Sequence, residues 1–195
     1  MNNEITLKRY QQQIDKGYRR FGILLIVLFV SIITIQSSVA QTPALTATTK
    51  IDKSESQMTA RINSTRAKGC KCGRKYYRSV DPVKWSKKLK LSSQDYAAQM
   101  HRYKRFDHNG IDGSVVGDRV DAVGYFWQLA GENIGEGYNT FEEVYRAWLA
   151  SPSHCELIMN GRMKDLAVSR QGKYWVLHMG LHMPPGTDRS NVRYH

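Results

Sequence analysis

The chain has 195 residues, of which 41% are hydrophobic, so it is long enough for one domain with flanking segments and has enough apolar side chains for a core. Lysine and arginine outnumber aspartate and glutamate by 29 to 17, which gives a formal net charge of +12. No nucleic-acid-binding motif accompanies this charge, which excludes nucleic acid as the expected partner.

The first forty residues are typical of a signal peptide. Basic residues precede the apolar run Phe21–Ile35, which is shorter than the roughly 20 residues that a membrane-spanning helix needs. Small residues follow at positions 38 to 40, so we predict cleavage before Gln41, with a retained membrane anchor as the alternative. The protein is therefore expected to be secreted, periplasmic or in the cell envelope, and to contact a membrane only through an uncleaved N-terminal segment.

The rest of the chain is divided by composition. Residues 41–56 are polar and lack periodicity, which predicts a flexible leader. One domain is then expected over residues 57–183, followed by a loose polar tail over 184–195. Its first element is predicted as a short helix over Met58–Ala67 that ends near Gly69, a residue suited to a left-handed cap.

The three cysteines predict a disulfide rather than a metal site. Cys70 and Cys72 are one residue apart, which is not the usual spacing of structural zinc ligands, and the only other cysteine is Cys155. In an exported chain, a bridge between Cys72 and Cys155 is the first choice and one between Cys70 and Cys155 the second. A ring between Cys70 and Cys72 would be strained, and three reduced thiols are the remaining alternative.

Two amphipathic helices are predicted from apolar residues at steps of three and four. The first covers residues 85–104, and its remaining faces are basic, which indicates a solvated surface or, alternatively, an anion-binding one. The second begins after Thr140, whose side chain and that of Glu143 are expected to form a capping box. Glu142 and Glu143 are therefore interpreted as first-turn charges rather than catalytic acids. The two inner stripes are Trp85, Leu89, Ser93, Tyr96, Met100 and Tyr103, and Phe141, Val144, Tyr145, Trp148 and Leu149.

Between these helices, His108 is followed by a turn-rich loop that would place its imidazole and the Asp112 carboxylate at the mouth of a pocket. Capping of the turn by Asp112 is an equal alternative. A short helix over residues 116–123 is expected to end at Gly124, with Arg119 tying it to neighbouring loops.

The C-terminal part of the domain is predicted as a β-hairpin. Residues 165–170 and 173–182 are both β-compatible and are joined by a turn that contains Gly172. His178 and His182 would share one face of the second strand. Because no motif surrounds them, they are interpreted as packing or surface residues.

Glu132 is the most unusual charge in the sequence, because it lies in the small, apolar run Ala130–Gly135. Burying its carboxylate costs several kcal/mol unless it finds a partner, and imidazoles are suitable partners. His108 and His154 lie in marked settings on either side. The sequence therefore predicts that the fold brings His108, Glu132 and His154 together.

These residues belong to a series of short motifs that resembles the bacterial branch of the CAP superfamily. Its domain, also called the SCP domain, is shared with cysteine-rich secretory, antigen 5 and plant pathogenesis-related proteins. The resemblance spans Ile62 to Leu181 and rests on this order: Phe106-x-His108, Asp112-Gly113, Asp118-Arg119, Gly124-Tyr125, Gly131-Glu132-Asn133-Ile134, Trp148-x-x-Ser151-Pro152-x-His154 and Tyr174-Trp175.

The resemblance implies an α/β (α+β) fold, namely a three-layer α-β-α sandwich with a small, mainly antiparallel sheet between helices. It also implies a cleft lined by two histidines and two acidic residues, sometimes with a divalent metal. His108, Glu132 and His154 match this set, and Asp112 takes the place of the second acid. Asn133 belongs to the same motif as Glu132. The sequence departs from the family at Ser153, where glycine is common.

Three functions are compatible with such a cleft, and binding is favoured over catalysis. The favoured one is a binding module for a lipid, a sterol or a cell-wall glycan. The alternatives are a metal-dependent hydrolase, with Glu132 or Asp112 as base, and a purely structural polar cluster. Zinc or another divalent metal would be held by His108 and His154, with Glu132 as third ligand or as the acceptor that orients one imidazole.

The positive charge lies mainly outside the predicted signal peptide. Residues 1–40 hold five basic and two acidic groups, which leaves +9 on the remainder. Such an excess attracts lipid headgroups or anionic cell-envelope polymers by long-range, salt-screened forces.

Overall fold

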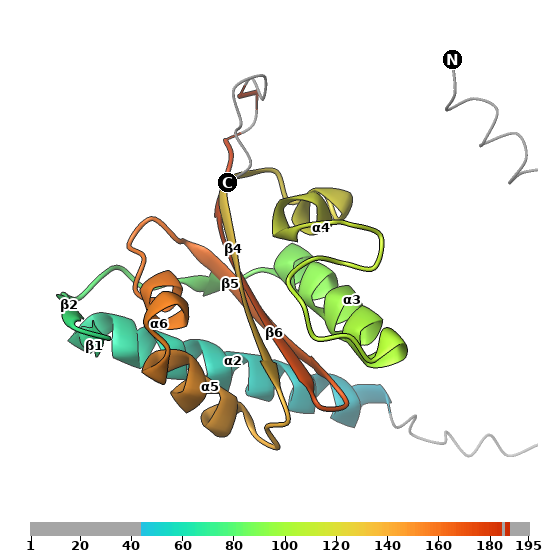
Figure 1. The fold of residues 1–195 in the computed structure, drawn as a ribbon, viewed down its shortest axis with the longest axis horizontal. Helices are drawn as coiled ribbons and strands as arrows, with labels where there is room; N and C mark the ends of the chain where they lie inside the picture. Colours follow the sequence, from blue (N-terminus) through green and yellow to red (C-terminus); the bar gives the residue numbers. More distant parts are fainter. Residues whose placement is uncertain (1–43, 185, 188–195) are drawn as a thin grey trace, which may run out of the picture. The chain divides into compact units, whose positions relative to one another are not determined.

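A four-stranded sheet forms the middle layer of the domain (Figure 1). A computed structural model describes residues 44–184, 186 and 187, with side chains from residue 53 onward. The strands lie in the order β3 (Lys84–Trp85), β5 (Asp165–Gln171), β6 (Tyr174–His182) and β4 (Trp127–Glu136). Only the β3–β5 pair is parallel, so the sheet is mainly antiparallel, as predicted. The predicted cleavage site and most of the predicted tail lie outside the described residues.

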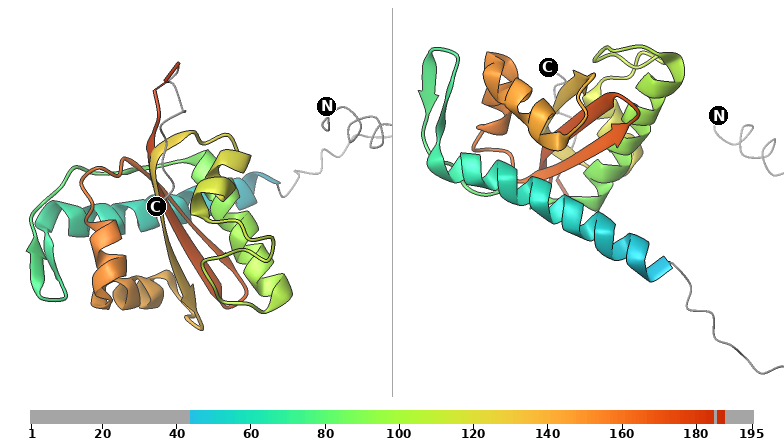
Figure 2. Two further views of the ribbon diagram at one scale, coloured as in Figure 1. Left: turned by 45° about the horizontal axis from the view of Figure 1, so that its top comes forward. Right: turned by 90° about the horizontal axis from the view of Figure 1, so that it is seen from below.

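Helices cover both faces of this sheet, which confirms the three-layer α/β architecture (Figures 1 and 2). One face carries α2 (Ala44–Lys68), α5 (Phe141–Ala150) and α6 (Pro152–Ile158). The other face carries α3 (Lys87–Tyr103) and α4 (Val116–Ala122). The alternation of side chains along β6 explains the two cores, because Trp175, Leu177 and Met179 pack towards α2 and α5 while Tyr174 and Val176 pack towards α3.

Two glycines let the helices approach β4 closely. A Cβ atom at Gly131 would lie 2.4 Å from a Leu157 methyl carbon, and one at Gly135 would lie 2.4 Å from a Val144 methyl carbon. The small residues around Glu132 are therefore explained by the packing of α5 and α6 on the opposite face of the strand.

Most predicted elements are confirmed with small shifts in their ends. α3 begins at Lys87 because Ser86 caps it, and Trp85 lies in β3 instead of the helix. Its buried stripe runs from Leu89 to Met100, whereas Tyr103 is exposed. Thr140 is the N-cap of α5 as predicted, since its Oγ1 accepts the Glu143 N–H, but the Glu143 carboxylate accepts the Asn139 N–H, so the capping box is only half formed. The predicted 165–182 hairpin is present as β5 and β6.

The N-terminal part of the domain corrects the sequence prediction. Residues 44–56 were expected in a flexible leader, and the first helix was expected only over Met58–Ala67, but Ala44–Lys68 is one helix. Its periodicity is weak, and it is stabilised by contacts with other elements rather than by its own sequence. Glu55 forms an ion pair with Lys90 of α3, and Ile62 is buried in the main core.

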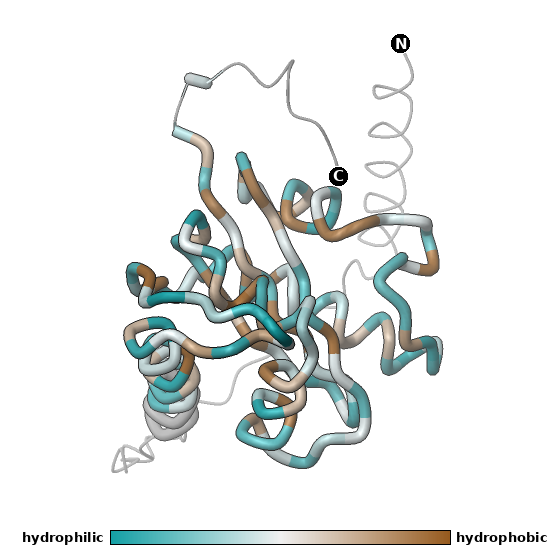
Figure 3. Tube along the Cα trace, turned by 60° about the vertical axis from the view of Figure 1, so that its left-hand side comes forward, coloured by the Kyte–Doolittle hydropathy of each residue, from teal (hydrophilic) through white to brown (hydrophobic). Residues whose placement is uncertain are grey.

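A small hairpin, β1 (Cys70–Cys72) and β2 (Lys75–Tyr77), follows α2. A disulfide joins Cys72 to Cys155 of α6, which confirms the first choice made from the sequence. Hydrophobic and hydrophilic residues are interspersed along the trace of the domain (Figure 3). Within the described residues, no helix is both long and apolar enough to cross a membrane.

Candidate functional site

Glu132 lies in the middle of the edge strand β4 and is the centre of a buried polar network. Its side chain is only 3% exposed, and its carboxylate accepts hydrogen bonds from three side chains. His108 Nδ1 lies 2.7 Å from Oε1, while Arg119 Nη2 and His178 Nε2 each lie 2.8 Å from Oε2. The sequence prediction that Glu132 needs an imidazole partner is therefore confirmed for His108.

Arg119 connects this carboxylate to the loop that carries His108. Its guanidinium donates to the carbonyl oxygens of Ser114, at 2.6 Å, and His108, at 3.0 Å, as well as to Glu132. It also lies 3.6 Å from the centre of the Tyr96 ring, where a cation–π contact stabilises it. Arg119 thus ties α4 to a neighbouring loop, as predicted, and it also neutralises Glu132.

His178 is the member of the network that sequence reasoning missed. It is fully buried on β6, directly opposite Glu132 in the β4–β6 register. Its Nδ1 has no hydrogen-bond partner among the described residues, so a proton there would be buried and unsatisfied. Burial lowers the pKa of His178 despite the nearby Glu132, which keeps the ring neutral with its proton on Nε2. The alternation along β6 was a usable signal, but β4 was not predicted as its partner strand.

The network fixes the charges of its members in different ways. Burial alone would raise the pKa of Glu132, but hydrogen bonds from His108 and His178 and the charge of Arg119 outweigh it and lower the pKa to about 2. The hydrogen bond to Glu132 raises the pKa of His108. The side chain of His108 is 55% exposed, so its second nitrogen, Nε2, is the part of the network that a ligand can reach.

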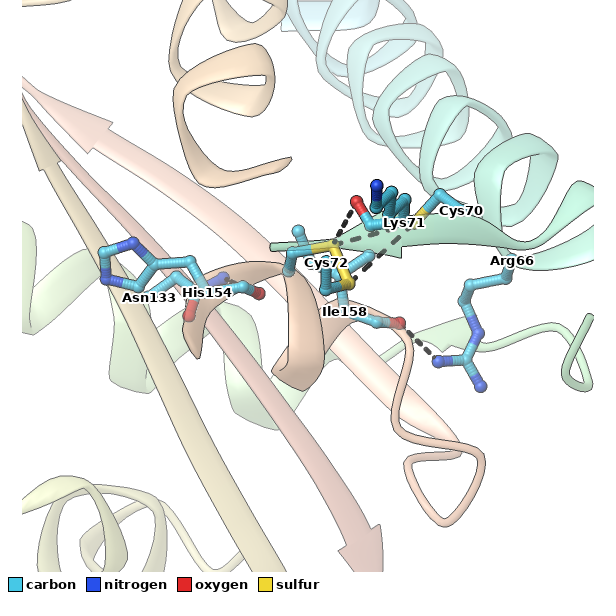
Figure 4. The surroundings of a disulfide bond; sticks show 8 residues. Arg66, Cys70, Lys71, Cys72, Asn133, His154 and Ile158 are labelled. Atoms are coloured by element: carbon cyan, nitrogen blue, oxygen red, sulfur yellow. Dashed lines mark hydrogen bonds between the residues drawn. A yellow bond between two sulfur atoms is a disulfide. The ribbon is translucent and has the colours of Figure 1, made fainter. Parts of the chain in front are cut away.

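His154 and Asn133 belong to the opposite side of β4. Consecutive residues of a strand face opposite sides, so Asn133 faces α6 while Glu132 faces α4. The buried Asn133 side chain donates to the His154 carbonyl oxygen at 3.0 Å and thereby holds the first turn of α6 (Figure 4). Burial, followed by the charge of His108, lowers the pKa of His154. His154 is not a hydrogen-bond partner of Glu132.

Asp112 lies outside this network. Its exposed carboxylate accepts the Ser114 N–H at 3.0 Å, which is the turn-capping role considered as the alternative. Hydrogen bonds from Ser114 lower the pKa of Asp112. Its role as the second acid of a cleft stays a prediction.

Glu132 lies behind the His108 ring, so it can act on a ligand of that ring only through the imidazole. Among the described residues, the three cysteines are the one group of three or more histidine, cysteine or acidic side chains whose ligand atoms lie close enough to share an ion. His108, Glu132 and His154 do not form such a group. A histidine that donates one nitrogen to a carboxylate presents the other to a metal or substrate, and His108 has this arrangement.

A groove of about 520 Å³ lies elsewhere on the domain. It runs along β5 between α2 and α3 and combines apolar side chains, among them Met58, Phe141 and Trp175, with the basic Lys90 and Arg170. None of the five candidate cleft residues lines it, so the polar network and this partly apolar space are separate features.

Residues 59–178 match the model of the CAP family, which is described as the cysteine-rich secretory protein family, over more than half of the chain. The protein YkwD of Bacillus subtilis (strain 168), described as uncharacterized, is 29% identical over 98 residues. That alignment covers 49% of this chain and 38% of YkwD.

Two solved structures share the fold. An extracellular protein containing an SCP domain from Bacillus anthracis str. Ames superposes with a TM-score of 0.59 at 19% identity, covering 66% of this chain and 40% of that one. An outer surface protein of Borrelia burgdorferi gives a TM-score of 0.55 at 16% identity, covering 69% and 94%. This chain thus spans less than half the length of both Bacillus proteins.

Proposed function

Because the chain belongs to the cysteine-rich secretory protein (CAP) family, we propose that it is an exported binding module that takes a polar ligand on His108 and His154. The observation that carries this proposal is the state of Glu132. Its carboxylate is buried, already accepts three hydrogen bonds and has a pKa lowered to about 2. A general base needs a pKa nearer to neutrality and a free oxygen, so Glu132 is suited to orient His108 and not to take protons from a substrate.

The chemistry of the exposed imidazoles favours a ligand rich in hydroxyl or phosphate groups. The hydrogen bond to Glu132 raises the pKa of His108, so this ring is protonated more readily than a free imidazole, whereas burial lowers the pKa of His154. Together they offer a donor and an acceptor to one ligand. Among the expected ligand classes, a cell-wall glycan or anionic envelope polymer fits this site best, and the positive charge of the chain supports it.

A lipid or sterol is the second candidate, and the groove along β5 favours it. Its volume of about 520 Å³ and its apolar lining suit an acyl chain or a sterol ring system. Arg170 lies at the same groove and would meet an anionic headgroup, whereas Lys90 is already paired with Glu55. This ligand would bind at a place different from His108.

Zinc or another divalent metal would use the same imidazoles as the polar ligand. His108 Nε2 and His154 would hold the ion, and Glu132 would act through His108 Nδ1. A bound ion would supply Lewis-acid polarisation of a ligand oxygen. Metal-dependent hydrolysis is disfavoured as the function because Glu132 is not available as the base, although Asp112 lies on the neighbouring loop.

Calorimetric titration of zinc into the metal-free protein tests the metal part of this proposal. His108→Ala and His154→Ala should each remove most of the affinity, and binding should weaken as the pH falls through about 6.5, where imidazoles become protonated. His182→Ala is the matched control, since it removes an exposed imidazole outside the network. If both histidine variants bind zinc as tightly as the wild type does, the metal site is ruled out and the network has only a structural role.

Sedimentation with insoluble cell-wall glycan, and separately with phospholipid vesicles, tests the ligand class. Retention on glycan that is lost in His108→Ala supports the polar site. Retention on vesicles that is lost in Arg170→Ala, which removes an exposed side chain of the groove, but kept in His108→Ala supports the groove. Release of soluble glycan fragments over time would instead show turnover and would overturn the binding-module assignment.

A further inference from the structure

Three sulfur atoms meet where the β1–β2 hairpin packs on α6 (Figure 4). Cys72 and Cys155 form the disulfide, and Cys70 is the remaining free cysteine of the described residues. The Cys70 sulfur lies 3.6 Å from the Cys155 sulfur and 4.0 Å from the Cys72 sulfur. The free thiol is therefore in contact with the bridge.

The strand geometry of β1 explains why two cysteines face one. Residues i and i+2 of a strand point to the same side, so Cys70 and Cys72 both face α6 while Lys71 between them is exposed. Cys155 on α6 thus has two possible partners on one strand.

Burial restricts which thiol reaches the bridge. Cys72 is 2% exposed and Cys155 is fully buried, whereas Cys70 is partly exposed. A thiol in solution is kept away from the two bonded sulfurs, but Cys70 already touches them. An intramolecular attack is therefore favoured over an attack from outside.

We propose that Cys70 exchanges with the disulfide, so that the bridge alternates between Cys72–Cys155 and Cys70–Cys155. The Cys70 thiolate attacks the Cys155 sulfur, a new S–S bond forms, the old one breaks, and Cys72 leaves as a thiolate that takes up a proton. One disulfide replaces another, so the step needs no oxidant or reductant. Burial raises the pKa of the Cys70 thiol, so the reacting thiolate is a minor form and exchange is expected over minutes to hours.

The exchange reaches the candidate site through α6. His154 directly precedes Cys155, and Asn133 holds the His154 carbonyl oxygen. The other end of the helix is fixed, because Arg66 donates to the Ile158 carbonyl oxygen at 2.6 Å. Closing the 3.6 Å gap between the Cys70 and Cys155 sulfurs to a covalent bond shifts Cys155, and with it the first turn of α6 and His154.

The wild-type protein allows a direct test, because trypsin cleaves after Lys71 and separates the two cysteines into different peptides. The protein is incubated at pH 8 for several hours, quenched with acid, alkylated and mapped without reduction. We expect alkyl label on both Cys70 and Cys72, and two bridged peptides that contain Cys155. Label on Cys70 alone at every time point would overturn the proposal.

Two variants give matched controls. Cys72→Ser should form the Cys70–Cys155 bridge after air oxidation, whereas Cys70→Ser should keep only the Cys72–Cys155 bridge. If Cys72→Ser folds but leaves both remaining thiols open to alkylation, the proposal fails. If it does not fold, the wild-type time course still decides.

Histidine NMR signals test the coupling to the candidate site. The His154 ring signal should differ between Cys72→Ser and Cys70→Ser, while the His182 signal should stay the same. Identical His154 signals in the two variants, with both bridges confirmed by mapping, would overturn the effect of exchange on the site.

Discussion

Arg66 and Glu132 are two of the buried charged side chains of the described residues, and they differ in the kind of group that satisfies them. Arg66 of α2 is fully buried and donates only to backbone carbonyl oxygens, those of Asp81, Ile158, Asn160 and Met163. Glu132 of β4 accepts only from side chains, those of His108, Arg119 and His178. Both charges are satisfied, but by partners of a different kind.

Carbonyl oxygens do not titrate, so the contacts of Arg66 are the same at every ordinary pH. Burial lowers the pKa of Arg66, yet the guanidinium stays charged, as arginine does in proteins. It joins the loop before β3 to the end of α6 and to the segment before β5. The partners of Glu132 include two imidazoles, one of which is exposed. The first region therefore holds the fold, and the second responds to pH.

Arg66→Met should give the largest effect. Methionine fills a similar volume but leaves four carbonyl oxygens without their donor, and we expect a loss of roughly 3–5 kcal/mol in the free energy of unfolding. Urea unfolding at pH 7 measures it. Arg61→Met is the control, because Arg61 pairs with Glu142 at the surface and its loss should matter far less. Similar midpoints for the two variants would contradict the structural role of Arg66.

Glu132→Gln should give the second-largest loss of stability. The amide keeps the size of the side chain but leaves the buried Arg119 without its counter-ion, which costs roughly 2–4 kcal/mol. The same urea measurement applies, with Glu142→Gln as the control at the surface. A loss that equals that of Glu142→Gln would mean that the network contributes little to stability.

The stability of the wild type should be greatest near pH 6.5, because the three histidines act in opposite directions. His108 has a raised pKa, so the folded state holds its proton more tightly, and this stability is lost as the pH rises through that raised value. His154 and His178 have lowered pKa values, so the unfolded state binds more protons below about 6.5 and stability falls as the pH falls.

Glu132 adds a second loss in acid. Its pKa is lowered to about 2, so its contribution is complete above the ordinary value of 4.5 and is lost as the pH falls from there towards 2. Urea midpoints between pH 3 and 9 measure both limbs. His108→Gln should flatten the alkaline limb and leave the acid limb. If the urea midpoint of the wild type does not change with pH, the network around Glu132 is as insensitive to pH as the contacts of Arg66, which would contradict the proposed difference between them.

The sequence predicted the local elements better than the contacts between distant ones. The helix stripes, the N-cap at Thr140 and the β5–β6 hairpin depend on neighbouring residues, and they are confirmed. Glu132 was recognised because a carboxylate in an apolar run needs a partner. His178 as its partner depends on the β4–β6 register, which is set over a separation of more than forty residues. Arg66 gave no signal, because on a weakly amphipathic helix it looks like a surface charge.

Asp112 is a charged side chain of a third kind, because it is exposed. Its replacement should change the stability and the zinc affinity least. The Asp112 carboxylate accepts a backbone N–H from Ser114, as an asparagine side chain also can. Asp112→Asn should therefore leave both the urea midpoint and the zinc titration unchanged. Asp112→Ala removes the acceptor and should loosen the loop that carries His108, which a change in the His108 NMR signal would report. If Asp112→Asn keeps the midpoint but weakens zinc binding, its negative charge acts on the ligand. Asp112 would then be the second acid of the site, and the responsive region would extend beyond the partners of Glu132.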